Sequence, residues 1–308
     1  MKLFFAPLQG YTDAAYRRFH NEVFEGCIDC YYTPFLRIEC NEVRRKDLRD
    51  ILPENNLGVN IVPQIIVKDV DEFRVLVDAI LSNGYDEIDI NMGCPFPLQT
   101  KKGRGAALLS RPDIVAEILK ELKGYSNIKF SVKMRLGNDE ISQWQQILPI
   151  LNDTPLNHIT LHPRIATQQY KGNVDLNSFR QIYDAVNHRI VYNGDISTID
   201  DILRLKTNFP NLYGIMIGRG LLSSPSLVWE YVNNVSLSQD QQIEKFLMLH
   251  NKLFQYYESK LQGDSQLLTK MKTIWDYSES LIDHKSHKQI KKASNIAKYK
   301  QIVSSLNK

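Results

Sequence analysis

The sequence predicts an α/β protein: an eight-stranded β/α (TIM) barrel followed by a small all-helical C-terminal domain. Eight short runs rich in β-branched and aromatic residues recur along the chain, and a helical pattern follows each run. Six of the seven steps between the ends of successive runs are 25 to 31 residues long, the length of one strand–helix unit. Eight such units favour a barrel over a doubly wound sheet, because a closed barrel leaves no strand edge exposed.

The expected strands are mostly continuous apolar runs. Segments such as Ile-Val-Tyr at 190–192 and Ile-Met-Ile at 215–217 are typical of parallel strands that are buried on both faces. We expect the strands at Leu3–Ala6, Cys30–Phe35, Ile61–Ile65, Glu87–Asn91, Lys129–Met134, His158–His162, Arg189–Asn193 and Gly214–Gly218.

Capping signals mark the ends of two of the intervening helices. Asp69 with Glu72 predicts a capping box, in which each side chain accepts a hydrogen bond from the other residue's backbone. Ser110 with Asp113 predicts a similar start for the next helix, and Gly124 predicts its end.

The pattern changes after about Val235. Ser238 with Gln241 predicts another capping box, at the start of a long helix that ends near Leu261. Further helices are expected over 266–283 and 288–306, which divides the chain into a barrel domain at 1–237 and a helical domain at 238–308.

Composition is that of an ordinary globular protein. The 308 residues are 43% apolar and 24% charged with a formal net charge of +3, which excludes wholesale disorder. No stretch approaches the roughly 18 to 20 apolar residues of a membrane span, and the apolar stretch at the N-terminus is too short for a signal peptide. Four cysteines are too few for a disulfide framework, so we expect a cytoplasmic protein, with a monomer as the default state.

Charge is unevenly distributed along the chain. From residue 241 to the end there are twelve lysines, no arginine and six acidic residues, a balance of +6, so the first 240 residues carry −3. The last 25 residues contain seven lysines and no acid. Such a run is either an ordinary solvated face or a surface that binds phosphates, and the charge count alone leaves both interpretations open.

Polar side chains follow six of the expected strands. The carboxyl ends of barrel strands converge on one mouth, where the catalytic residues of this fold lie. Polar groups at the ends of buried strands are costly unless they meet a ligand or one another. The residues concerned are Gln64, Asn91, Cys94, Lys133, Arg135, His162, Arg164, Asn193, Gly194, Asp195, Gly218 and Arg219.

The last two strand ends predict a phosphate site. The segments 193–195 (Asn-Gly-Asp) and 218–220 (Gly-Arg-Gly) supply backbone N–H groups and one guanidinium where barrel enzymes commonly bind phosphate. With Lys133 and His162 further round the mouth, they suit a phosphorylated ring cofactor such as FMN. The Lys133 cation would stabilise negative charge on the reduced ring, and the Gln64 amide would contact the ring edge.

One cysteine differs from the other three. Cys94 lies between Gly93 and Pro95 in the loop that leaves the fourth strand, so it faces the mouth. A thiol with an ordinary pKa of about 8.5 is mostly protonated at neutral pH and serves as a general acid. Nucleophilic catalysis is the competing role, but it would require His162 as base from two strands away.

The remaining cysteines are interpreted as small buried hydrophobes. Cys27 and Cys30 have the spacing of half a zinc site, and Cys40 and His20 lie near them in the sequence. No second cysteine pair follows, so we expect no metal.

The motifs together resemble those of the tRNA-dihydrouridine synthases, flavin enzymes that reduce uridines in tRNA. The matching segments run in the same order across about 220 residues, and the helical tail matches the family's tRNA-binding domain in position and size. They are 6–13 (APLQGYTD), 89–95 (DINMGCP), 132–137 (VKMRLG), 170–172 (YKG), 193–196 (NGDI) and 216–220 (MIGRG).

This resemblance implies a role for each matching position. Cys94 resembles the catalytic acid, and Asn91 a residue that faces the target nucleotide. Arg135 and Arg164 are similar to rim arginines near flavin or RNA, while Lys101, Lys102, Lys291 and Lys292 are expected to contact tRNA. The implied FMN site comprises Pro7, Leu8, Gln9, Gln64, Lys133, His162, Asn193, Gly194, Asp195, Gly218 and Arg219.

This chain departs from the family pattern at three places. Leu8-Gln9 replaces a more usual methionine and its neighbour, Pro97 stands where a lysine is frequent, and Pro163 stands where glycine is common. In the loop that contains Pro97, Lys101, Lys102 and Arg104 would supply the missing charge.

The implied reaction has two halves. NADPH first reduces FMN, which then delivers hydride to C6 of the uracil while the Cys94 thiol protonates C5 from the opposite face. The uridine must be turned out of the RNA stack to enter the barrel mouth. The lysines of the tail would meanwhile bind phosphates.

Two other functions remain open from the residues alone. A small-molecule flavin oxidoreductase of the dihydroorotate dehydrogenase kind would share the barrel, the phosphate site and a cysteine at the mouth, but would not need the basic tail. A non-catalytic RNA-binding protein would need the tail but neither Cys94 nor a flavin, and it would be colourless.

Overall fold

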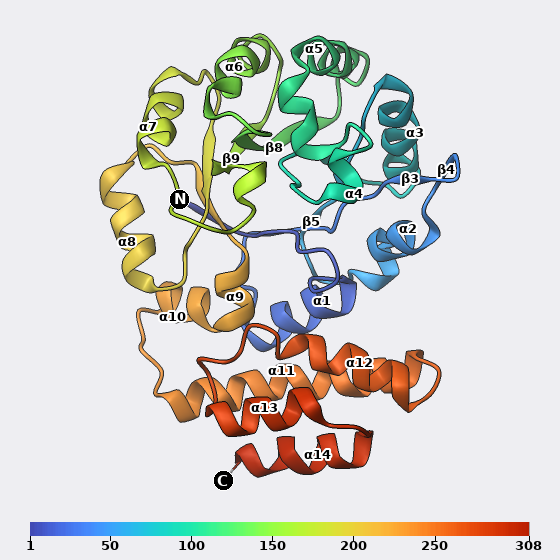
Figure 1. Ribbon diagram of the computed structural model, residues 1–308, viewed down its shortest axis with the longest axis vertical. Coiled ribbons are helices and arrows are strands. Elements are labelled where there is room, and N and C mark those ends of the chain that lie inside the picture. Colours follow the sequence, from blue (N-terminus) through green and yellow to red (C-terminus); the bar gives the residue numbers. More distant parts are fainter. Residues whose placement is uncertain (308) are drawn as a thin grey trace.

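The computed structural model describes residues 1–307, which form a parallel barrel wrapped by helices, with a helical C-terminal region packed against one side (Figure 1). The strand order in the sheet is β5-β2-β1-β11-β10-β9-β8-β7-β6. The strands of this sheet are β1 (Lys2–Phe5), β2 (Cys30–Tyr32), β5 (Ile61–Val62), β6 (Gln64–Ile65), β7 (Glu87–Met92), β8 (Lys129–Gly137), β9 (His158–Ile165), β10 (Ile190–Asn193) and β11 (Gly214–Ile217).

The third expected strand closes the barrel although it is interrupted. Pro63 separates β5 from β6, and it has no N–H to donate to a neighbouring strand. β5 pairs with β2 through Tyr31 and Ile61, whereas β6 pairs with β7 through Gln64 and Asp89. The two ends of the strand order are therefore one continuous segment, which confirms the eight-unit barrel.

Helices cover the outside of the barrel, and a short antiparallel hairpin follows β2 (Figure 1). The hairpin is β3 (Ile38–Glu39) and β4 (Glu42–Val43). The helices of this part are α1 (Ala14–Val23), α2 (Arg45–Ile51), α3 (Val70–Leu81), α4 (Pro97–Thr100), α5 (Pro112–Lys120), α6 (Trp144–Asn152), α7 (Leu176–Ala185), α8 (Ile199–Asn208), α9 (Arg219–Ser223) and α10 (Leu227–Asn233).

Of the three expected capping boxes, that of Ser238 is complete, that of Asp69 is half present and that of Ser110 is absent. Asp69 accepts a hydrogen bond from the Glu72 N–H at 2.9 Å, but the Glu72 carboxylate pairs with Arg104 instead of completing the box. Ser110 does not cap α5, because its hydroxyl oxygen accepts from Gln143 at 3.0 Å. The box of Ser238 at the start of α11 is present in both directions.

The C-terminal region contains shorter helices than the sequence predicts. They are α11 (Gln239–Lys260), α12 (Asp264–Ile274), α13 (His284–Lys292) and α14 (Ile296–Ser304). The expected helix over 266–283 ends at Ile274, and the one over 288–306 is two helices. Asp283 caps α13 through the Ser286 N–H, and Asn295 caps α14 through the Lys298 N–H, each at 2.9 Å. These local caps override the apolar periodicity that runs through both segments.

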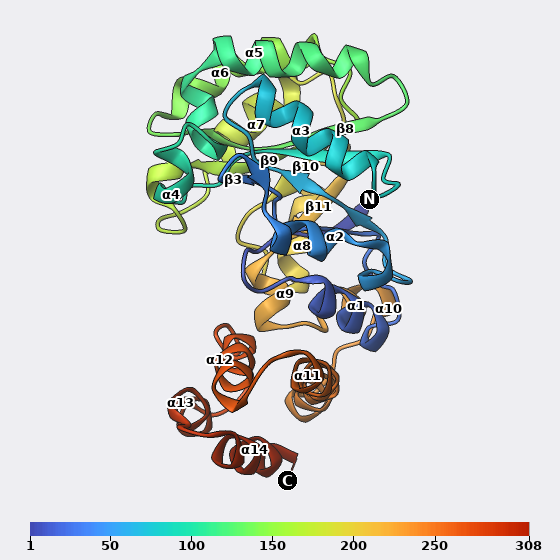
Figure 2. The same ribbon diagram turned by 90° about the vertical axis from the view of Figure 1, so that its right-hand side faces the viewer.

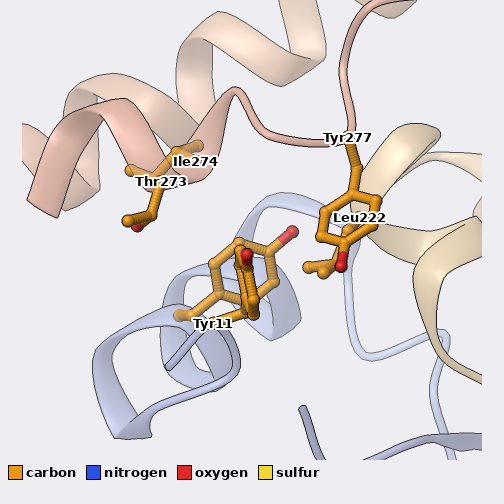
Figure 3. Close-up of a pocket in the computed structure, with 6 residues that line it drawn as sticks. Tyr11, Leu222, Thr273, Ile274 and Tyr277 are labelled. Carbon is orange, nitrogen blue, oxygen red and sulfur yellow. The ribbon is translucent and has the colours of Figure 1, made fainter. Parts of the chain in front are cut away.

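The first turn of the barrel is joined to the helical region. Asp13 caps α1, forms an ion pair with Lys270 at 2.9 Å and accepts a hydrogen bond from the Tyr257 hydroxyl at 2.7 Å. The Tyr11 hydroxyl donates to Asp276 at 3.0 Å, and its ring meets that of Tyr277 edge to face. Figure 3 shows these two tyrosines at a cavity of about 10 Å³ between the barrel and the helices.

Among the described residues, no helix combines the length and the apolar character that a membrane crossing requires.

Candidate active site

Asn91 fixes the loop that contains Cys94. Its Oδ1 accepts hydrogen bonds from the N–H groups of Gly93 at 3.0 Å and Cys94 at 2.8 Å. Its Nδ2 donates to Oε1 of Gln64 at 2.7 Å. Asn91 is thus buried beneath the loop at the end of β7, and its amide is already engaged within the protein. A contact with a nucleotide, as expected from the sequence, stays a prediction.

A buried carboxyl lies below these two amides. Nε2 of Gln64 donates to Oδ2 of Asp89 at 2.6 Å, and the Ser131 hydroxyl donates to Oδ1, also at 2.6 Å. Burial raises the pKa of Asp89 to about 6. The chain Asp89–Gln64–Asn91 therefore sets the orientation of both amides, and Gln64 is engaged internally rather than free to read a ring edge. The sequence motif contains Asp89 without indicating this role, although an acid inside an apolar strand is a signal of one.

The Cys94 thiol is half-buried at the mouth. Burial raises the pKa of this thiol, and the nearby cations of Arg135 and Lys133 oppose the rise without cancelling it. The thiol is consequently protonated at neutral pH and can donate a proton. Gly105, at φ +62°, folds the loop back onto Cys94, where a Cβ would lie 2.9 Å from the Cys94 carbonyl oxygen. A glycine is required there by both the conformation and the space.

His162 is not an activating base for this thiol. β8 lies between the strands that precede the two residues. Burial, together with the surrounding cations, lowers the pKa of His162 well below its ordinary value. Its Nε2 accepts a hydrogen bond from Nη1 of Arg164 at 3.2 Å, so the imidazole is neutral. The arrangement favours the acid role of Cys94 over a nucleophilic one.

Two cations lie close together beside Cys94. Burial and the neighbouring Arg135 lower the pKa of Lys133 to about 8, and within residues 1–307 its ammonium makes no hydrogen bond or ion pair. Arg135 donates to the carbonyl oxygens of Gly93 and Ile165, each at 3.0 Å, and thereby ties the loop after β7 to the end of β9. Lys133 is therefore a half-buried cation that makes no ion pair in the described part of the chain, although the nearby Asp89 carboxyl partly offsets the lowering of its pKa. An anionic ligand would stabilise its charge.

Arg164 has a different environment from a rim arginine. It is buried, its two Nη atoms bind the two carboxylate oxygens of Asp195, and Nη2 also donates to the Gly172 carbonyl oxygen at 2.5 Å. It thus joins the loops that follow β9 and β10. Its charge is engaged by Asp195, and a contact with flavin or RNA stays a prediction.

The loops after β10 and β11 approach each other as the sequence predicts. Arg219 Nη2 donates to Oδ1 of Asp195 at 3.3 Å, and the Asn193 side chain donates to the Met216 carbonyl oxygen at 2.7 Å. Arg219 keeps about a third of its side chain exposed.

Each of these loops contains a glycine that packs closely against neighbouring side chains. A Cβ on Gly194 would lie 3.0 Å from Val174 and 3.2 Å from His162, and one on Gly218 would lie 3.4 Å from the Ala6 side chain. The available guanidinium of Arg219 and these two side-chain-free positions fit a phosphate and the ring attached to it.

Tyr170 occupies the centre of the mouth, and the sequence indicates no role for it beyond its place in a matching segment. Its ring is stacked on that of His162 with centroids 6.4 Å apart. The guanidinium of Arg219 lies 4.2 Å from the ring centroid and that of Arg135 lies 5.6 Å away. No local pattern in the sequence indicates this clustering, because Arg135 lies in β8, His162 in β9 and Arg219 at the start of α9.

The remaining expected positions are at the edges of the site. Pro7 and Leu8 are half-buried and Gln9 is exposed in the turn after β1, where the Leu8 N–H donates to the Thr12 hydroxyl at 2.9 Å. Lys101 and Lys102 are exposed beyond Cys94.

The two lysines expected on the helical region differ from each other. Lys292 is exposed, whereas Lys291 is half-buried, pairs with Asp276 and donates to the Lys272 carbonyl oxygen at 3.1 Å. Within the described part of the chain, no three His, Cys, Asp or Glu side chains are grouped to hold a metal ion.

Solved structures with the same fold share little sequence identity with this chain. Histamine dehydrogenase from Rhizobium sp. 4-9 superposes with a TM-score of 0.56 at 11% identity, over 80% of this chain but about half (49%) of that protein. Morphinone reductase, in complex with tetrahydroNAD, superposes with a TM-score of 0.55 at 9% identity, over 77% of this chain and 88% of the other. These likenesses show the class of fold, a β/α barrel with helices on its outside.

Sequence comparison defines the family. The family model described as Dihydrouridine synthase (Dus) matches residues 4–306, and the chain belongs to this family. A probable tRNA-dihydrouridine synthase of Staphylococcus aureus (strain COL) is 28% identical over 260 residues, which cover 82% of this chain and 77% of the relative. A tRNA-dihydrouridine(16) synthase of Neisseria meningitidis serogroup B is 26% identical over 232 residues, covering 73% of this chain and 69% of the relative.

Proposed function

We propose that this protein reduces the C5=C6 bond of uridines in tRNA to give dihydrouridine, with FMN as the bound cofactor, NADPH as the reductant and Cys94 as the proton donor. Family membership and the names of the relatives support the reaction and the substrate. The observation that carries the proposal is the protonated thiol on the rim of a mouth that also contains an unpaired lysine and a glycine-lined pair of loops.

The residues at the mouth fit FMN. Arg219 and the backbone of the loops at 193–195 and 218–220 would hold its phosphate, and the absence of a Cβ at Gly194 and Gly218 leaves room for the group. Lys133 and His162 would contact the ring, and Pro7, Leu8, Gln9 and Gln64 would complete the site. When bound, the reduced flavin supplies the hydride for C6 of the uracil.

Cys94 completes the reduction by moving one proton. As hydride adds to C6, electron density passes to C5, and the Sγ–H of Cys94 donates its proton there. The thiolate that remains is stabilised by the cations of Arg135 and Lys133, which already lower the pKa of this thiol against the effect of burial. Asn91 keeps the thiol in place through the Cys94 N–H.

The lysines would bind the phosphates of tRNA. Lys101 and Lys102 lie beyond Cys94, and Lys292 is exposed on α13, so a single RNA could contact the barrel domain (1–237) and the helical domain (238–308) together. Lys291 is the weaker candidate of the four, because Asp276 already neutralises its charge.

The test uses the purified full-length protein, NADPH and an unmodified tRNA transcript. We expect the protein to carry flavin absorbance and to form dihydrouridine, detected by mass spectrometry of the digested RNA. A colourless protein would favour the RNA-binding alternative. A yellow protein that oxidises NADPH but leaves every uridine intact would favour the small-molecule oxidoreductase.

A further inference from the structure

An exposed apolar turn lies immediately after Cys94. Phe96 is 57% exposed and Leu98 is 66% exposed, and the intervening Pro97 is exposed as well. Large apolar side chains cluster on a protein surface mainly where a partner covers them. The turn begins α4, which projects from the barrel on the same side as α12 and α13 (Figure 2).

The turn is rigid, so its exposure is not a consequence of disorder. The Phe96 carbonyl oxygen accepts hydrogen bonds from the N–H groups of Gln99 at 2.8 Å and Thr100 at 3.1 Å. Prolines on both sides of Phe96 restrict its backbone, which has φ −70° and ψ 125°. The backbone of the turn is therefore constrained, which lowers the entropic cost of placing the ring against a partner.

Arg104 anchors the far end of the same loop. It is buried, forms an ion pair with Glu72 and donates to the Ile38 carbonyl oxygen at 3.0 Å. The Ala106 N–H donates to the Cys94 carbonyl oxygen at 3.1 Å, which closes the loop against the cysteine. The thiol and the apolar turn thus belong to one loop, whose ends are held by the Arg104–Glu72 ion pair and the hydrogen bond from Ala106 to Cys94.

We infer that Phe96 stacks on the base next to the target uridine, with Leu98 against the same nucleotide. This inference rests on the proposed function and names a contact that the reaction needs. A uridine that enters the mouth no longer stacks on the neighbouring base of the tRNA. One face of that base is then exposed to water. An aromatic ring two residues from the thiol covers that face, and base–aromatic stacking tolerates any base.

Charge favours RNA over a second copy of this chain as the occupant. Lys101 and Lys102 are exposed in the same loop, three and four residues after Leu98. In a symmetric contact between two copies, these four lysines would meet and repel one another. Phosphates on either side of a stacked nucleotide would instead pair with them.

The test compares Phe96→Ala, Phe96→Leu and Phe96→Trp in dihydrouridine formation on an unmodified tRNA transcript. The alanine variant should lose about 5- to 150-fold in kcat/KM, the effect of removing one stacked base. The leucine variant should remain impaired, while tryptophan restores activity because it keeps a π-face. Leu57→Ala is the matched control: Leu57 is also 66% exposed but precedes β5, at the end of the barrel opposite the mouth.

Each outcome decides between stated possibilities. Equal kcat/KM for wild type and Phe96→Ala would overturn the stacking role, and full activity of Phe96→Leu would reduce it to an apolar contact without stacking. Bound flavin, measured by absorbance, shows that each variant is folded. If sedimentation shows a wild-type dimer that Phe96→Ala dissociates, the turn is a contact between copies. If the wild type itself forms no dihydrouridine, the proposed function has failed independently of Phe96.

Discussion

The barrel mouth and the helical region use positive charge in opposite ways. At the mouth, burial lowers the pKa of Lys133 to about 8 and that of Arg135 to about 10, and Arg164 is buried against Asp195. On α13, Lys285, Lys288 and Lys292 are exposed. A buried cation raises the free energy of the empty site until an anion arrives, whereas an exposed one costs little and acts only through a screened contact with phosphate. Under the proposed function, the buried cations of the mouth would therefore bind the cofactor, and the exposed lysines of α13 would bind tRNA phosphates.

The largest difference between the two regions concerns stability. Asp195→Ala leaves Arg164 buried without its carboxylate, so we expect a decrease of about 3 kcal/mol in the free energy of unfolding. Glu258→Ala removes an equivalent ion pair in the helical region, between Lys300 and Glu258, in which both side chains are about half exposed. That decrease should stay below about 1 kcal/mol. Urea denaturation of both variants measures the two effects, and equal decreases would contradict the comparison.

A second difference is the response to pH. The pKa of Lys133 is about 8 in the folded protein, below its ordinary value of 10.5. Between these values the unfolded chain binds a proton that the folded one does not, so stability rises with pH across that window. Lys133→Met should remove this contribution, which is at most about 3 kcal/mol in the flavin-free protein. Denaturation of wild type and variant at several pH values measures it, and parallel curves would show that Lys133 is not buried as a cation.

The exposed lysines should make the affinity for tRNA depend on salt concentration. Replacing Lys285, Lys288 and Lys292 together by glutamine should weaken tRNA binding and lower the slope of log affinity against log salt by about 0.7 to 0.9 for each phosphate that the protein no longer neutralises. Flavin affinity should not change. Filter binding at several salt concentrations provides the measurement. An unchanged slope would mean that the lysine-rich end is an ordinary solvated face.

The smallest expected effect is a difference in tRNA affinity between variants of two adjacent lysines, Lys291 and Lys292. Lys292→Gln should weaken tRNA binding more than Lys291→Gln, because Lys291 already pairs with Asp276. Lys291→Gln should instead affect the helical region itself, since it also removes the hydrogen bond to the Lys272 carbonyl oxygen. Filter binding of the two single variants gives the comparison. The reverse order of affinities would show that RNA displaces Asp276 from Lys291.

The barrel was predictable from sequence because each strand is a continuous apolar run with a recurring spacing. The interruption at Pro63 did not disturb the prediction, since both halves lie on one short segment. The C-terminal helices were less predictable. Asp283 and Asn295 each cap the start of a new helix within a segment whose apolar spacing is continuous. Such a cap changes the direction of the chain without changing the average hydropathy, so the apolar pattern does not reveal it.

The clustering of polar residues at the strand ends was predictable from the sequence, but the hydrogen bonds and ion pairs between them were not. Polar residues at strand ends marked the mouth, and Arg219 lies beside Asp195 as expected. The Arg164–Asp195 ion pair joins residues 31 positions apart, and the hydrogen bond from Gln64 to Asp89 joins residues 25 positions apart. Such partners are set by the register of neighbouring strands, which no local pattern specifies.

The central claim is that the Cys94 thiol gives its proton to the uracil of a bound tRNA. The most direct measurement is a single turnover: wild type and Cys94→Ala, each loaded with flavin and reduced by NADPH, are mixed with unmodified tRNA, and dihydrouridine is counted against time. We predict that Cys94→Ala retains its flavin and its reduction by NADPH but forms dihydrouridine about 10² to 10⁴ times more slowly, while Cys40→Ala, at an exposed cysteine of the β3–β4 hairpin, keeps the wild-type rate. Dihydrouridine formation by Cys94→Ala at the wild-type rate would contradict the claim.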